Sequence, residues 1–172
     1  CNRFRPAVVC HDMRAPVFLL TLLFLAPFLH ADSPVTIAVL RYEPVDASRQ
    51  RTVPVKIYRV KSAEARPVIV FSHGLGGSRE NGVYLAEHWA RNGYVAVFVQ
   101  QAGSDESGWK EAERGERMAA MKQAASARSL LDRLGDVPFV LDQLELWNAE
   151  SGHALHGALD LEQGVIVDFD RH

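Results

Sequence analysis

The sequence predicts an α/β fold in which antiparallel strands lead into a parallel sheet with flanking helices. Residues 68–71 are β-branched or aromatic and run into a glycine-rich turn at 73–77, which is typical of a buried strand before a helix. A second apolar run at 94–99 follows an amphipathic segment. Strand, helix and strand in this order indicate a parallel β-α-β unit.

Two segments before this unit are predicted to be antiparallel strands. Residues 36–42 (TIAVLRY) and 53–60 (VPVKIYRV) partly alternate apolar with polar side chains and are rich in Val and Ile. A polar connection, 43–48, separates them. Pro67 is expected at the first position of the central strand, where its missing N–H costs no interior hydrogen bond.

The first helix is predicted over residues 80–92. Ser78 is a suitable N-cap, and Asn92 followed by Gly93 is a typical helix end. The helix would carry one apolar face, because its leucine, tryptophan and alanines recur at a spacing of four. It would therefore pack on the sheet between the two parallel strands.

Two further helices are predicted between residues 118 and 147. We expect Gly135 to end the first, and Asp136 to cap the second with Pro138 in its first turn. Helical spacing of apolar side chains is explained by packing alone. The methionines and Trp147 are therefore expected in the core. The first helix has apolar residues at helical spacing, and the second has a buried stripe; the residues are Met118, Met121, Ala125, Ala127, Leu131 and Leu134, then Val140, Leu144 and Trp147.

Composition indicates one small globular domain. The chain has 172 residues, of which 48% are hydrophobic and 23% charged. A net charge of −2 gives no indication of a nucleic-acid or anionic-membrane partner. The sequence begins with Cys1, so Met13 is the expected start, and residues 1–12 are expected to lie upstream of it.

Residues 13–31 have the pattern of a secretory signal peptide. An arginine precedes an apolar run at 17–29, which is short for a membrane span, and Leu29-His30-Ala31 is a suitable cleavage site. Cleavage there predicts a periplasmic or extracellular domain of residues 32–172, with no stable membrane span. An uncleaved anchor is the alternative. The mature domain would lack both cysteines and so would have no disulfide.

Three other patterns in the sequence have simpler explanations than a functional site. His153 and His156 are spaced for a shared zinc ion, but flanking glycines argue against a helix there, so no metal site is expected. A dinucleotide-binding turn would need a glycine where Arg79 stands and an acidic residue where Gln100 stands, so no cofactor is expected. Ser104, Asp105 and Ser107 are interpreted as an ordinary solvated turn.

A family resemblance rests on four blocks of sequence in a fixed order. These are VPVKIYRV, then VIVFSHGLGGSRENGVYLAEHWARNGYVAVFVQ, then GSDESGWK, then DVPFVLDQLELWN followed by LDLEQ. Residues 41–163 resemble the amino-terminal half of the α/β-hydrolase family that includes platelet-activating-factor acetylhydrolase-like and predicted dienelactone-hydrolase-like esterases. One departure is Gln101-Ala102, where relatives often carry His-Pro.

The resemblance implies a carboxylic-ester hydrolase with an oxyanion loop at residues 73–76. In that family the amide after His-Gly is one of two oxyanion donors, and this position is Leu75. Gly74 and Gly76 would shape the loop. His73 would hold it through ring hydrogen bonds rather than act as a base, because the triad of this fold comes later in the sequence. The implied substrate is a small ester or lipid-like molecule.

The nucleophile that the resemblance implies is missing from the sequence. A Gly-x-Ser-x-Gly elbow should follow LDLEQ, but residues 164–172 read GVIVDFDRH, which could form one more strand. A truncated product, a frameshift after Gln163 and a short non-catalytic protein are the three explanations. We expect the chain alone to be inactive and to self-associate through an uncovered sheet. The alternative function is a non-catalytic exported interaction module.

Overall fold

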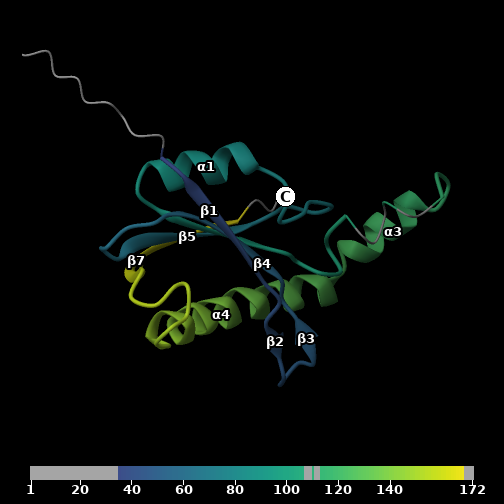
Figure 1. The fold of residues 1–172 in the computed structure, drawn as a ribbon. Helices are drawn as coiled ribbons and strands as arrows, with labels where there is room; N and C mark the ends of the chain where they lie inside the picture. Colours follow the sequence, from purple (N-terminus) through teal and green to yellow (C-terminus); the bar gives the residue numbers. More distant parts are fainter. Residues whose placement is uncertain (1–34, 107–109, 111–112, 169–172) are drawn as a thin grey trace, which may run out of the picture. The chain divides into compact units, whose positions relative to one another are not determined.

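A computed structural model of the chain describes residues 35–106, 110 and 113–168 (Figure 1). Its main sheet has five strands in the order β1-β4-β6-β5-β7. The first two pairs in this order are antiparallel and the last two are parallel, so the predicted α/β fold is confirmed. The strands are β1 (Ile37–Tyr42), β4 (Val55–Val60), β6 (Val95–Val99), β5 (Arg66–Ser72) and β7 (Leu159–Asp168).

The two leading strands pair as the alternating pattern predicted. Ile37 lies opposite Val60 and Tyr42 opposite Val55. The central strands β5 and β6 have buried side chains along most of their length, as a parallel strand covered on both faces should. A short hairpin of β2 (Val45–Asp46) and β3 (Arg51–Thr52) joins β1 to β4.

Helix α1 (Val83–Arg91) covers one face of the sheet (Figure 1). Ala86 and Ala90 are buried against an aromatic cluster that includes Phe71 and Phe98, whose rings stack at 4.5 Å. The predicted helix start was wrong. Gly82, at a φ of 72°, is the N-cap, while the Ser78 hydroxyl accepts a hydrogen bond from the Glu80 amide in the turn before the helix.

Helix α4 (Ala127–Ala149) covers the other face and is preceded by α3 (Arg117–Ala124). Val140 and Leu144 are fully buried among the valines of β4, β5 and β6, as predicted, and Trp147 is partly buried against the same cluster. The predicted break at Gly135 is wrong, because α4 runs through Gly135 and Pro138 from an N-cap at Ser126.

A buried ion cluster beside Gly135 explains why a glycine stands inside the helix. A Cβ there would lie 2.6 Å from Nη1 of Arg49, so the glycine makes room for a guanidinium on the helix surface. Asp136 is fully buried and accepts hydrogen bonds from Arg49 at 2.9 Å and from Arg51 at 2.8 Å. Its carboxylate therefore fixes the β2–β3 hairpin to α4 and caps no helix.

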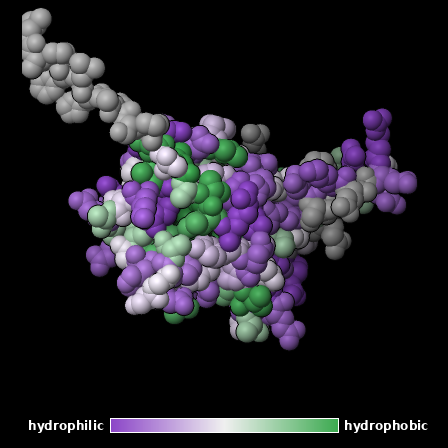
Figure 2. All heavy atoms as spheres, in the orientation of Figure 1, coloured by the Kyte–Doolittle hydropathy of each residue, from purple (hydrophilic) through white to green (hydrophobic). Residues whose placement is uncertain are grey.

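Two side chains predicted to be in the core are exposed. Met118 and Met121 on α3 are open to solvent, so that prediction was wrong for them, and Leu131 and Leu134 on α4 are exposed as well. The final strand begins at Leu159, earlier than the nine residues in which a strand was expected, and leaves Val165 and Ile166 half exposed. Figure 2 shows further apolar surface over β1 and at the β2–β3 hairpin, where Val39 and Val45 are exposed.

The predicted signal peptide at 13–31 and the residues before it lie outside the described residues. In the part that is described, no helix is long and apolar enough to cross a membrane.

Candidate functional site

The glycine-rich turn after β5 forms one wall of a cavity of about 640 Å³. Phe71, residues 73–77, Asn81 and Gly82 line the cavity, so both the turn and the start of α1 contribute. Gly76 has a φ of 75°, which favours glycine. At Gly77 a Cβ would lie 2.9 Å from the His73 ring, so any larger residue would displace the turn.

The Leu75 backbone N–H in this turn is free, whereas the two amides that follow it are paired. The Gly76 amide donates to the Ser104 carbonyl at 2.7 Å, and the Gly77 amide donates to the Gly74 carbonyl at 3.0 Å. The Leu75 amide donates to no residue in the described part of the chain. Leu75 is 40% exposed and lines the cavity, so an unpaired donor lies beside open space.

The ring of His73 is buried and both of its nitrogens are engaged. Nδ1 lies 2.8 Å from the Gly74 carbonyl, to which it donates, and Nε2 accepts the Gln101 backbone N–H at 3.1 Å. This pattern requires the neutral ring with its proton on Nδ1. Burial lowers the pKa of His73, which favours the same neutral form. The ring therefore links the turn after β5 to the loop after β6.

The loop after β6 is hydrogen-bonded to the turn at further points. The Gln100 side chain accepts the Arg79 amide at 2.8 Å and donates to the Asp105 carboxylate at 2.5 Å. The Glu106 amide donates to the Gly77 carbonyl at 3.0 Å. The solvated-turn interpretation is wrong for Ser104 and Asp105, which are buried, and Ser107 lies outside the described residues.

A second polar cluster lies beneath this loop, where β5 and β7 end. Ser72 accepts hydrogen bonds from Gln101 and from Arg133, both at 3.2 Å. Arg133 also donates to Asp168 at 2.8 Å. No local sequence pattern indicates this cluster, because Arg133 stands in an ordinary helical segment and its partners are far away in the sequence.

The two candidate zinc ligands do not converge. Nδ1 of His153 accepts the Leu155 amide at 3.2 Å, and the ring stacks on Trp147 at 5.4 Å. His156 contacts the Asn148 carbonyl instead. Within the described residues no group of three histidine, cysteine or acidic side chains is placed to hold a metal ion.

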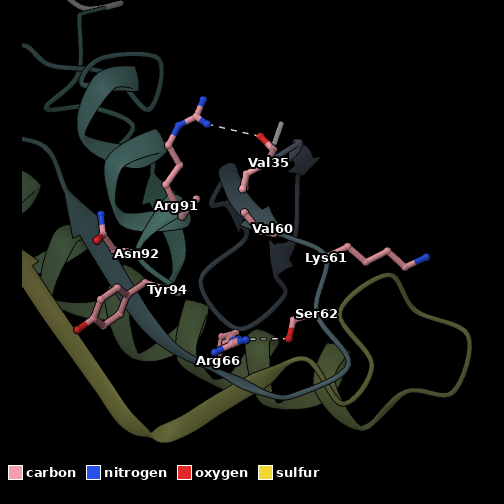
Figure 3. A pocket seen from close by; sticks show the side chains of 10 residues that line it. Val35, Val60, Lys61, Ser62, Arg66, Arg91, Asn92 and Tyr94 are labelled. Carbon is pink, nitrogen blue, oxygen red and sulfur yellow. Dashed lines mark hydrogen bonds between the residues drawn. The ribbon is translucent and has the colours of Figure 1, made fainter. Parts of the chain in front are cut away.

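A separate cavity of about 410 Å³ lies at the opposite ends of β5 and β6 (Figure 3). Its three cations do not point to a common centre. Arg91 reaches the Val35 carbonyl, Arg66 donates to Ser62, and Lys61 points away. We therefore take the cavity at the glycine-rich turn as the candidate functional site.

The chain is similar to known proteins both in sequence and in fold. The family model described as platelet-activating factor acetylhydrolase, isoform II, matches residues 44–125, which include the turn, α1, β6 and the loop after it. A ferulic acid esterase from Streptomyces cinnamoneus superposes with a TM-score of 0.57 at 19% identity, over 79% of this chain and 52% of the esterase. The fold is that of an α/β-hydrolase.

A second similar α/β-hydrolase structure is a predicted dienelactone hydrolase from Klebsiella pneumoniae subsp. pneumoniae. It has a TM-score of 0.49 at 18% identity, over 77% of this chain and 50% of that one. The chain thus spans about half the length of the α/β-hydrolases that it resembles. No sequence among the curated proteins matches it.

Proposed function

We propose that this chain is the amino-terminal part of an exported serine hydrolase that cleaves carboxylic esters, and that the Leu75 amide is one of its oxyanion donors. The observation that carries the proposal is the unpaired Leu75 amide beside a cavity, in a turn where the next two amides, those of Gly76 and Gly77, are engaged. An unpaired amide held beside open space can stabilise developing negative charge without first breaking another hydrogen bond. The sequence match to an acetylhydrolase family over this turn supports the same role.

The surrounding hydrogen bonds suit this role because they fix the direction of the Leu75 amide. Gly76 and Gly77 are hydrogen-bonded to the loop after β6. The neutral His73 ring bonds to the Gly74 carbonyl and to the Gln101 N–H, so it links the turn to the same loop. We propose that His73, Gly74 and Gly76 act by positioning. His73 is a poor candidate for a general base, because Nε2, its one nitrogen without a proton, already accepts the Gln101 N–H.

The chain by itself is proposed to be inactive towards esters. No Gly-x-Ser-x-Gly motif occurs in the 172 residues, so a nucleophile of that type would have to be supplied from outside them. A short-chain p-nitrophenyl ester assay tests this. Sustained ester turnover that survives each single serine-to-alanine change would contradict the proposal that this chain is the amino-terminal part of a serine hydrolase.

Sequencing the gene beyond position 172, in all three reading frames, tests whether the nucleophile is encoded downstream. A downstream serine elbow would allow the longer protein to be assayed. In that protein, Leu75→Pro removes the amide proton and is expected to lower kcat by about 100- to 1000-fold. Leu75→Ala keeps the amide and is the matched control. Equal activity of the two variants would exclude Leu75 as an oxyanion donor.

Export is part of the same proposal and rests on the sequence pattern at 13–31. Amino-terminal sequencing of the protein recovered outside the cytoplasm is expected to begin at Asp32. Recovery of a chain that still carries residues 13–31 would favour an uncleaved anchor.

A further inference from the structure

A groove between α4 and β7 combines a buried cation with apolar walls. A cavity of about 270 Å³ is lined at its polar end by Arg133 and Asp168. An adjoining cavity of about 120 Å³ shares Ile166 with it and is entirely apolar along its side chains. The apolar lining of the two cavities is Leu130, Leu134, Val137, Pro138, Val68, Val70, Leu141, Leu161, Val165 and Ile166.

Arg133 has donors to spare at the head of this groove. Its side chain is 7% exposed, and the hydrogen bonds to Ser72 and Asp168 both come from Nη2. A guanidinium has five N–H donors. Nε and Nη1 donate to no residue that the structure describes, although the side chain is more than nine-tenths buried. Such donors favour a ligand with acceptor oxygens.

The apolar walls continue in one direction from Arg133. Arg133, Val137 and Leu141 follow one another at intervals of four along α4, so they lie on one side of the helix. With a rise of 1.5 Å per residue, the distance along the helix from Arg133 to Leu141 is about 12 Å. A linear hydrocarbon chain fits a groove of this kind.

We propose that the groove between α4 and β7 binds an aliphatic carboxylate, with one carboxylate oxygen accepting from Nη1 of Arg133 and its tail along Leu134, Val137 and Ile166. Asp168 sets a limit on affinity, because its carboxylate lies 2.8 Å from Nη2 of Arg133 and repels a second anion. This inference does not rest on the proposed ester hydrolysis, since it needs neither Leu75 nor a nucleophile.

Calorimetric titration of the full chain with octanoate tests the proposal, with acetate and octan-1-ol as probes for head and tail alone. We expect one octanoate per chain and much weaker binding of acetate and octan-1-ol. Arg133→Met is expected to weaken octanoate binding at least tenfold. Octan-1-ol that binds as tightly as octanoate, or no octanoate binding at all, would overturn the proposal.

Two exposed positions give variants that keep the fold. Leu134→Ser should weaken octanoate binding about five- to tenfold through lost apolar contact, whereas Leu146→Ser should not change it. These leucines are 63% and 60% exposed on the same helix, but only Leu134 lines the groove. Equal effects at both positions would indicate non-specific binding and contradict the proposal.

A third variant tests the head group. Asp168→Asn removes the competing carboxylate, so octanoate should bind more tightly. Weaker binding would contradict the placement of the octanoate carboxylate at Arg133.

Light scattering during the titration shows whether a second copy of the chain occupies the groove. A dimer that persists at saturating octanoate and excludes it would show that a second copy occupies the groove instead.

Discussion

The two halves of α4 are attached to the sheet by different forces. In the second half, Val140 and Leu144 are buried among the valines of the sheet. In the first half the leucines face solvent, and Arg133 and Asp136 make the attachment through ion pairs and hydrogen bonds. The comparison shows that a helix can cover a sheet without burying all its apolar residues, if charged partners reach it from other elements.

The largest effect is expected at the apolar half. Leu144→Ala should lower the free energy of unfolding by about 4 kcal/mol, because a fully buried leucine leaves a cavity when it is truncated. Urea unfolding followed by circular dichroism measures this. Leu146→Ala, two residues further on an exposed face, should change stability by less than about 0.5 kcal/mol. Similar losses at the two positions would mean that the apolar contact is not what holds this half.

The ion-paired half should respond to the loss of one charge. Asp136→Asn leaves Arg49 and Arg51 without their buried partner and should cost about 3 kcal/mol. The same unfolding measurement applies. Asp132→Asn, on a partly exposed side chain, is the control and should cost about 1 kcal/mol or less. If Asp136→Asn is neutral, the first half of α4 is held by something other than these ions.

A pH effect is expected where the two loops meet at His73. The folded pKa of His73 lies below its ordinary value of 6.5, because burial disfavours the charged ring. As pH falls, the unfolded chain binds a proton at this histidine before the folded chain does. The stability that the neutral, buried His73 contributes is therefore present above about pH 6.5 and is lost below it. Protonation would also place a hydrogen on Nε2, against the Gln101 N–H.

Unfolding free energies at pH 7.5 and pH 5.5 measure this contribution. The difference between the two should shrink in His73→Gln and stay unchanged in His88→Gln, which alters an exposed histidine on α1. Asp46 titrates in a lower range, because hydrogen bonds from Ser48 and Arg49 hold its pKa at about 2. An unchanged difference in His73→Gln would show that His73 does not set the pH dependence.

The sequence predicted the elements that depend on local pattern. The strands around the glycine-rich turn, the turn itself and the buried pair Val140 and Leu144 follow from apolar periodicity and from glycine placement. Two of the errors share one cause, which is contact between residues distant in the sequence. Gly135 is a helix end by local rules, but Arg49 on the β2–β3 hairpin needs its small size. Ser104 and Asp105 have the residue types of a solvated turn, but the turn after β5 packs against them and buries them.

The smallest change in stability is expected on the exposed leucines of the ion-paired half. Leu131→Gln should alter the free energy of unfolding by less than about 0.5 kcal/mol, because its side chain faces solvent. We expect it nevertheless to weaken self-association, since Leu131 is an exposed apolar side chain outside the groove, which a second copy can cover while the groove stays open. Sedimentation velocity over a range of concentrations measures this, with Leu146→Gln as the control. A dimer weakened only by Leu146→Gln would place the contact at the other end of the helix, and the two halves of α4 would then differ in attachment but not in exposure to partners.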